Sequence, residues 1–320
     1  MTKRILITGA AGFIGFHAAK ALQRRGDQVI GLDNFNSYYP VSLKRARESE
    51  LRKQGIKIYE LDISAPGCMQ ELFDSFAPTH ILHLAAQAGV RYSLEEPQAY
   101  IRSNIQGFVE ILELCRKNPA VKLIYASSSS VYGESTTTPF TETAEVNSPV
   151  SLYGATKRTN ELFASTYRHL FGISSTALRY FTVYGPWGRP DMAYFLFTQA
   201  ILEGRPIPLF NRGEMLRDFT YVDDAVQGTL AAIDLGAEKE VFNIGSHKPI
   251  PLLDFVKTLE EVIGIPAKIE HKMMQQGDVT HTYADIAHSQ KRLGFNPVFS
   301  LKEGLQHFFD WYQTTSGHFH

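Results

Sequence analysis

The sequence is poor in cysteine, which excludes a fold held together by disulfides. Cys68 and Cys115 are the only cysteines in 320 residues, and they lie far apart in the chain. Isolated cysteines are typical of small buried side chains in a reducing compartment. No Cys/His cluster offers a closed set of metal ligands, and His80 and His83, three apart on a predicted strand, face opposite ways. We therefore expect no metal site.

Long apolar runs and an excess of charge of either sign are also absent. No stretch reaches the length of a transmembrane helix, and Thr8 and Gly9 end the apolar run near the N-terminus too early for a signal peptide. The net charge of −1 creates no global field that would attract nucleic acid or an acidic membrane. The GxxxxGKS pattern of nucleotide hydrolases is missing. We expect a cytoplasmic protein that would meet an anionic substrate with local positive charge.

What is present is an alternation of apolar, strand-like runs with helix-like segments. The order β–α–β–α predicts an α/β fold, a doubly wound parallel sheet of the Rossmann type with helices on both faces. Strands are expected at 4–8, 28–33, 57–62, 80–86, 122–128 and 175–181, and helices at about 13–25, 44–54, 67–76, 95–117 and 152–171.

The second half has a different rhythm, which begins with the proline- and glycine-rich segment 185–190. Ser151 and Ser300 are candidate helix N-caps. We expect residues 1–183 with about 217–248 to form the Rossmann domain, and about 184–216 with 249–320 to form a smaller C-terminal α/β lobe. The further strands are predicted at 207–210 and 240–245, and the helices at 217–236 (entered through Asp223 or Asp224), 251–264 and 300–313.

Three glycines directly after the first strand point to a dinucleotide site. The spacing Gly9-x-x-Gly12-x-x-Gly15 lets the chain turn sharply and brings backbone N–H groups and a helix N-terminus towards a pyrophosphate. Asp33 ends the second strand, where a carboxylate binds ribose hydroxyls and repels a 2′-phosphate, so NAD is favoured over NADP. Asp62, after the third strand, is either an adenine contact or a turn residue.

Tyr153 and Lys157 lie four residues apart near the start of a predicted helix, on one helix face. A lysine ammonium beside a phenol stabilises the phenolate, so we expect a lowered pKa for Tyr153, and a phenolate is a general base for a sugar hydroxyl. The serine run 127–130 ends the preceding strand and places hydroxyls at the carboxyl edge of the sheet, where such folds bind ligands.

The segments TGAAGFIG, HLAAQAGVR, SSSSVYG, YGATK and RYFTVYGPWGRPDMA resemble, in order and spacing, the extended short-chain dehydrogenase/reductase (NAD-dependent epimerase/dehydratase) family. The similarity covers essentially the whole chain, and taken together the segments are similar to the family's UDP-glucuronate 4-epimerases. The resemblance implies a catalytic triad of Ser128, Tyr153 and Lys157, with Ser127 and Ser129 as alternatives for the serine. Phe16 and Gln276 depart from the family pattern, which usually has serine and proline there.

The resemblance also implies which residues hold tightly bound NAD and a UDP-sugar. Arg189 would grip the sugar carboxylate, Arg217 the diphosphate and Asp278 the uridine ribose, with Phe210 and Asn211 near the uracil. The implied NAD-binding residues are Gly9, Ala11, Gly12, Phe13, Ile14, Gly15, Asp33, Asn34, Asp62, Ile63, Leu84, Ala85, Ala86, Tyr153, Lys157 and Tyr180. The implied substrate-binding residues are Ser127, Ser128, Ser129, Arg91, Thr182, Arg189, Phe210, Asn211, Arg217 and Asp278.

Within this resemblance the reaction is expected to be epimerisation at C4 of UDP-glucuronate to UDP-galacturonate through a 4-keto intermediate. Related dehydratases and decarboxylases carry acidic residues after the triad serine, whereas Ser129 and Ser130 stand here. Thr182, where neutral-sugar epimerases commonly have asparagine, and Arg189 favour a uronic acid, since an arginine fork binds a carboxylate bidentately.

Two other functions remain open from the sequence. One is a 4-epimerase of UDP-glucose and UDP-galactose, or of an N-acetylhexosamine. The other is an NAD-binding regulatory protein without catalysis, although the complete triad speaks against it. The resemblance further implies a homodimer formed through the helices at 95–117 and 152–171 and a role in polysaccharide biosynthesis.

Overall fold

The computed structural model describes residues 2–133, 135, 137–236, 240–273 and 281–315. A seven-stranded parallel sheet forms its centre, in the order β10-β6-β5-β4-β1-β2-β3. The doubly wound α/β fold is thereby confirmed. The strands span Arg4–Thr8 (β1), Gln28–Asp33 (β2), Lys57–Glu60 (β3), His80–His83 (β4), Lys122–Ser128 (β5), Ser175–Tyr180 (β6) and Glu240–Ile244 (β10).

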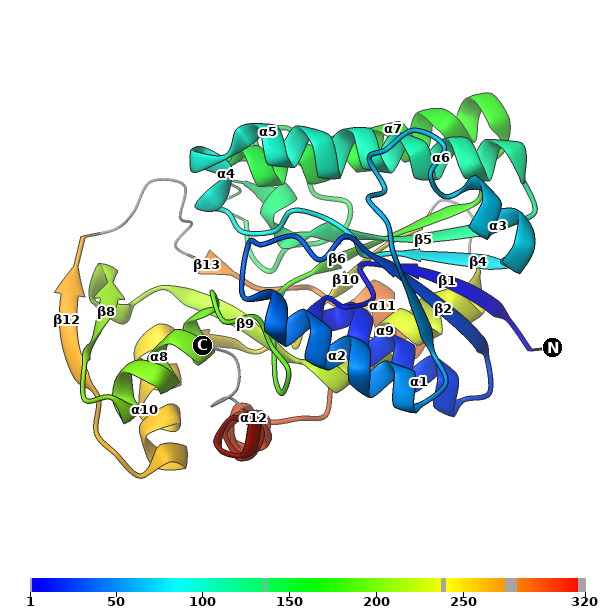
Figure 1. Ribbon diagram of the computed structural model, residues 1–320. Coiled ribbons are helices and arrows are strands. Elements are labelled where there is room, and N and C mark those ends of the chain that lie inside the picture. The colour runs from blue at the N-terminus through cyan, green and yellow to red at the C-terminus, as the bar shows by residue number, and fades with distance from the viewer. Residues whose placement is uncertain (1, 134, 136, 237–239, 274–280, 316–320) are drawn as a thin grey trace.

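Helices cover both faces of this sheet, because successive strand residues point to opposite sides. In β1, Ile5 and Ile7 pack into one core and Leu6 into the other. The first core is covered by α1, α2 and α9, and the second by α3, α6 and α7 (Figure 1). The helices span Phe13–Arg24 (α1), Val41–Lys53 (α2), Gln70–Phe76 (α3), Gly107–Lys117 (α6), Leu152–Phe171 (α7) and Val222–Leu235 (α9).

The helix expected over 95–117 is wrong in detail, because it is broken into several pieces. Helix α4 (Tyr92–Glu95) is followed by α5 (Pro97–Tyr100), the π-helix η1 (Ile101–Gln106) and then α6. Pro97 has no backbone N–H, so a helix cannot continue through it. In η1, the Asn104 amide donates to the carbonyl of Gln87 and to the hydroxyl of Thr156. These tertiary bonds tie the segment to the loop after β4 and to α7.

The helix expected over 217–236 is also partly wrong. Strand β9 (Leu216–Tyr221) comes first, and α9 begins only at Val222, with Asp223 and Asp224 in its first turn. Carboxylates in the first turn oppose the positive end of the helix dipole favourably. Ser151 accepts the N–H of Gly154 as the cap of α7, and Ser300 exchanges hydrogen bonds with Glu303 before α12, so both caps are confirmed.

The remaining elements build smaller sheets beside the large one. In one of them β9 pairs with β7 (Thr182–Tyr184), β11 (Pro249–Pro251) and β13 (His281–Thr282), and in another β8 (Pro206–Phe210) pairs with β12 (Lys268–Lys272). Helix α9 then packs on α1, and β10 joins the large sheet. The division into two domains stays a prediction. The other helices are α8 (Ala193–Leu202), α10 (Leu252–Ile263), α11 (Ala287–Leu293), α12 (Leu301–Thr315) and the 3₁₀ turns η2 (Ser129–Tyr132) and η3 (Asn211–Gly213).

Candidate active site

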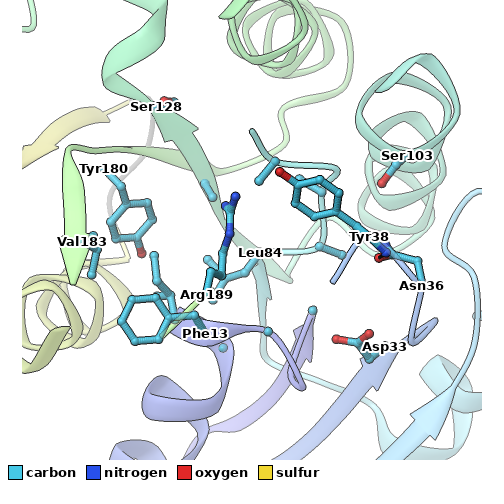
Figure 2. A pocket seen from close by; sticks show the side chains of 18 of the residues that line it. Phe13, Asp33, Asn36, Tyr38, Leu84, Ser103, Ser128, Tyr180, Val183 and Arg189 are labelled. Carbon is cyan, nitrogen blue, oxygen red and sulfur yellow. Dashed lines mark hydrogen bonds between the residues drawn. The ribbon is translucent and has the colours of Figure 1, made fainter. Parts of the chain in front are cut away.

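A cleft lies at the carboxyl ends of the large sheet's strands, where β1 neighbours β4 and the strand order reverses. Ligands of doubly wound folds bind at this reversal. Figure 2 shows Asp33 and Asn36 on one side of the cleft, Tyr180 and Val183 on the other, and Arg189 between them. The residues expected to bind ligands that line it are Gly9, Gly12, Phe13, Ile14, Gly15, Asp33, Asn34, Ile63, Leu84, Ala85, Ala86, Ser127, Ser128, Tyr153, Lys157, Tyr180 and Arg189.

The glycine loop forms the floor of the cleft. Gly9 has a φ of +71°, and a Cβ there would lie 2.7 Å from the amide nitrogen of Ala85. Helix α1 starts after Gly12, which offers no side chain to cap the first N–H groups. A helix start of this kind binds an anion through its free N–H groups and its dipole. The loop therefore fits a dinucleotide pyrophosphate, and Phe13 and Ile14 add apolar surface to the same cleft.

A Gly15→Ala substitution tests the loop. The new Cβ would lie 2.1 Å from the Gly9 carbonyl oxygen, so α1 must move away from the loop. Overpacking of this kind costs about 1–3 kcal/mol, and we expect the affinity for NAD, measured by isothermal titration calorimetry, to fall about tenfold or more. The control is Gly264→Ala, in open space at φ +77° after α10, which should lower stability by about 1 kcal/mol and leave NAD binding unchanged. Equal affinity in both variants would contradict this account of the loop.

The side chains of Asp33 and Lys44 both line the cleft beside the glycine loop. The Asp33 carboxylate accepts the N–H groups of Ala11 and Phe35, at 3.1 and 2.9 Å. Burial raises the pKa of Asp33, while Lys44 and these two amides act to lower it. Lys44 donates to the backbone and side-chain oxygens of Asn36, and burial lowers its pKa to about 8. Lys44 and Asn36 are cleft residues that sequence reasoning missed. Asn36 comes three residues after the end of β2, which is a usual place for a ligand contact, whereas Lys44 lies in α2.

Tyr153, Ser128 and Lys157 meet in the cleft. Burial raises the pKa of the Tyr153 phenol, while a hydrogen bond with Ser128 and the charge of Arg189 lower it. The net direction is opposite to the expected lowering, because the desolvation of a phenolate outweighs these favourable contacts. Lys157 donates to the carbonyl oxygen of Ala126 at 2.8 Å, and burial lowers its pKa to about 8.

Ser127 and Ser128 face different partners, which distinguishes two of the three candidate serines. The Ser127 hydroxyl donates to the buried Glu161 carboxylate at 2.6 Å, and Glu161 also pairs with the buried Arg179. Ser129 begins the turn η2 and does not line the cleft. Ser128 lines the cleft with Tyr153, and its hydroxyl oxygen accepts the N–H of Ser130 at 3.1 Å. Its role as the serine of the triad stays a prediction. The Glu161–Arg179 pair was not expected from the sequence, since its members lie 18 residues apart on α7 and β6.

Arg189 enters the cleft from the loop between β7 and α8. Its Nε donates to Asp191 Oδ1 at 3.0 Å and its Nη2 to Asp191 Oδ2, and its Cζ lies 5.7 Å from the ring centroid of Tyr38. The Tyr38 hydroxyl donates to Asp191 at 2.8 Å. The loop is anchored by the fully buried Arg47, which donates to the carbonyl oxygens of Trp187, Gly188 and Ala11. Arg47 therefore joins this loop to the glycine loop.

Other residues expected to bind ligands lie outside the cleft lining. Arg91 and Phe210 are far apart in the sequence but meet at 5.1 Å between guanidinium carbon and ring centroid, next to Asn211. Ala11 contributes its amide to Asp33, and Asp62 accepts hydrogen bonds from Asn34 and Ser64. Thr182 pairs with Phe219, and Arg217 lies on β9. Asp278 and Gln276 lie outside the described residues.

The described part of the chain contains neither a cluster of metal ligands nor a membrane-spanning helix. Its histidine, cysteine and carboxylate side chains form no group of three or more that could hold a metal ion. Among the helices of these same residues, none has the length and apolar character needed to span a bilayer. Cys68 and Cys115 are both free thiols.

Comparisons with known proteins give one family model and several 4-epimerases that are similar to this chain. The model of the NAD dependent epimerase/dehydratase family matches residues 5–245. UDP-glucuronate 4-epimerase 4 of Arabidopsis thaliana is 50% identical over 96% of this chain and 75% of its own length. A Bacillus cereus UDP-glucuronic acid 4-epimerase, solved with UDP-glucuronic acid and NAD, has a TM-score of 0.90 and 35% identity over 97% of this chain and 99% of its own. A Thermotoga maritima UDP-glucose 4-epimerase, solved with UDP-glucose, has a TM-score of 0.89 and 33% identity over 98% and 99%.

Proposed function

Because the chain belongs to the NAD dependent epimerase/dehydratase family, we propose that it interconverts UDP-glucuronate and UDP-galacturonate by epimerisation at C4. The observation that carries this proposal is that groups for acid–base chemistry and a cation line one cleft. Tyr153 and Ser128 supply the groups for proton transfer, and Arg189 supplies the charge that a sugar carboxylate requires.

NAD is the cofactor of the proposed reaction. The loop Gly9–Gly15 would hold the pyrophosphate of NAD, and Asp33 would bind its adenosine ribose. A buried carboxylate accepts hydrogen bonds from the 2′-hydroxyl of that ribose but would repel a 2′-phosphate. NAD bound there would supply reversible hydride transfer at C4 of the sugar, which epimerisation through a 4-keto sugar requires. Since the cofactor ends each cycle as NAD, no net reduction is expected.

Tyr153 is proposed to move the proton at the C4 oxygen. A phenolate at Tyr153 removes the proton from the C4 hydroxyl, and the resulting phenol returns it to the 4-keto oxygen in the second half of the cycle. Ser128, which lines the same cleft, would orient the C4 oxygen. Lys157 is fixed by the Ala126 carbonyl, and its buried ammonium opposes the cost of a negative charge in the cleft.

The same cleft favours plain epimerisation over elimination or loss of the carboxyl group. Serines 129 and 130 follow Ser128, so no carboxylate stands next in the chain to assist a second proton transfer. At the nucleotide end, Arg217 would bind the diphosphate, Phe210 and Asn211 would lie near the uracil, and Arg91 would add a further cation. Asp278 is proposed for the uridine ribose and Thr182 for the sugar.

A substrate panel tests the function directly. The purified chain is expected to carry NAD and to convert UDP-glucuronate into a mixture with UDP-galacturonate, followed by chromatographic separation and NMR of the products. UDP-glucose should be turned over with a kcat/KM lower by about 100-fold, since it leaves Arg189 without its anionic partner. Equal turnover of UDP-glucose would favour a neutral-sugar epimerase. The observation in favour of that function is the structural similarity of this chain to the Thermotoga maritima protein. NAD binding with no turnover of any UDP-sugar would favour the regulatory protein.

We further propose a homodimer in the cytoplasm that serves polysaccharide biosynthesis. Leu94, Ile101 and Leu162 are large apolar side chains that are 44–62% exposed on α4, η1 and α7. Helices α4 and η1 pack against α7, so these side chains offer a surface for a second copy. Two free thiols suit a reducing compartment. Sedimentation velocity of the wild type and of a Leu162→Glu variant separates dimer from monomer.

A further inference from the structure

Asp191 is a charged cleft-side residue to which the proposed mechanism gives no task. It lies two residues after Arg189, has a partly buried side chain, and accepts hydrogen bonds from both Arg189 and Tyr38. Burial acts to raise the pKa of Asp191, but Arg189 and Tyr38 hold it below its usual range. Asp191 is therefore a charged carboxylate placed beside the cation that is proposed to bind a second carboxylate.

The contacts of Asp191 leave only one edge of the guanidinium for a ligand. A guanidinium carries five N–H donors in a fixed plane. Asp191 uses the donor on Nε and one of the two on Nη2. The donors that remain are the second one on Nη2 and the pair on Nη1, and the free Nη2 donor and one Nη1 donor form the end of the fork. A sugar carboxylate would thus be gripped end-on, in the plane that Asp191 sets.

Tyr38 prevents this pair from turning as a unit. Its hydroxyl donates to Asp191, and its ring centroid lies 4.7 Å from that of Tyr92. There is no room for a side chain at Gly89, where an added Cβ would lie 2.4 Å from the Tyr38 hydroxyl. The backbone N–H of Arg189 donates in turn to the Tyr194 hydroxyl at 3.1 Å. Figure 2 shows the Arg189 side chain extending through the cleft towards Tyr38. Both ends of the arginine are therefore fixed by side chains from different elements.

We propose that Asp191 is a positioning residue which, with Tyr38, orients Arg189 so that the bound sugar carboxylate stays out of line with the C4 carbonyl. The proposal rests on the proposed function. It adds a task beyond binding, because the oxidised sugar is a β-keto acid. If its C5–C6 bond aligns with the carbonyl π system, that bond breaks, CO₂ leaves, and the electron pair becomes the C4–C5 enolate. A proton from water at C5 then gives a UDP-4-ketopentose.

The expected signature is a change of products rather than a loss of binding. In Asp191→Asn the guanidinium keeps its charge but loses a charged, two-point partner, so its plane is free to turn. The negative charge that repels the substrate carboxylate is also gone. We expect KM for UDP-glucuronate to stay within about twofold or to fall, kcat to fall about tenfold, and the ratio of CO₂ released to epimer formed to rise about tenfold.

The experiment uses the full NAD-loaded enzyme and UDP-glucuronate labelled with ¹⁴C at C6. Trapped ¹⁴CO₂ and separated UDP-galacturonate are counted for the wild type, Asp191→Asn, Tyr38→Phe and the control Asp254→Asn. Tyr38→Phe removes only the hydroxyl contact and should raise the ratio by a smaller factor, about threefold. Asp254→Asn, in an exposed ion pair with Lys257, should behave as wild type.

The results separate this proposal from the proposed function. A wild type that does not epimerise UDP-glucuronate overturns both. A wild type that does so, with the same CO₂ ratio in Asp191→Asn and Tyr38→Phe, overturns the positioning role alone. A raised KM and lost NAD in Asp191→Asn with an unchanged ratio in Tyr38→Phe would assign Asp191 a structural role and overturn the proposal as well.

Discussion

Replacing Tyr153 with phenylalanine is expected to lower kcat for UDP-glucuronate by about a thousand-fold. The phenol is the group proposed to take and return the proton at the C4 oxygen, and positioned acid–base groups contribute roughly 10²–10⁴ to rates. The phenyl ring keeps its packing against Tyr100, whose centroid lies 6.2 Å away, so the cleft should retain its shape. Steady-state kinetics with product separation measures the loss.

The matched control is Tyr167→Phe on the same helix. Tyr167 donates to Glu113 away from the cleft, and its loss should leave kcat unchanged. Both variants should bind NAD like the wild type and melt within a few degrees of it. A Tyr153→Phe variant with more than a tenth of wild-type kcat would show that another group moves the proton, and the mechanism above would be wrong.

Replacing Arg189 with alanine is expected to have the second largest effect, and a selective one. Truncating one partner of a buried charged contact costs about 2–5 kcal/mol, so kcat/KM for UDP-glucuronate should fall by about 100-fold or more. The rate for UDP-glucose should change little, since that sugar has no carboxylate at C6. The decarboxylated by-product should rise, because no fork then holds the carboxylate away from the carbonyl π system.

Arg205→Ala is the matched control, since Arg205 pairs with Glu203 two residues away, as Arg189 does with Asp191, but on the exposed surface. It should leave the kinetics with both sugars unchanged. Equal losses with UDP-glucuronate and UDP-glucose in Arg189→Ala would indicate a damaged loop rather than lost carboxylate recognition. Unchanged kinetics with both sugars would remove the argument for a uronic acid.

Much of the architecture followed from local pattern. Buried parallel strands are apolar along their whole length, and helices repeat their apolar positions every three to four residues, so their order could be predicted without coordinates. Where the sequence analysis was wrong, tertiary contacts decided the outcome. The segment 217–221 is a strand because β7, β11 and β13 supply hydrogen-bonding partners for it, which no local propensity encodes.

The candidate site residues divide in the same way. The glycine loop, Asp33, Tyr153 and Lys157 were predicted because spacing along one strand, turn or helix brings them together, and that spacing is written in the sequence. Which serine meets Tyr153, and which groups surround Arg189, depends on segments far apart in the chain. Asp191 meets Tyr38 across 153 residues, and Arg47 reaches Trp187 across 140.

The sequence by itself determined the fold class, the turn of the glycine loop into α1 and the shared helix face of Tyr153 and Lys157, because backbone geometry and short-range periodicity are local properties. Only the tertiary structure decided the pKa direction of Tyr153, the hydrogen bond of Ser127 to Glu161 and the pairing of Arg189 with Asp191. Burial and long-range contacts set these properties, and both exist only once the chain has folded.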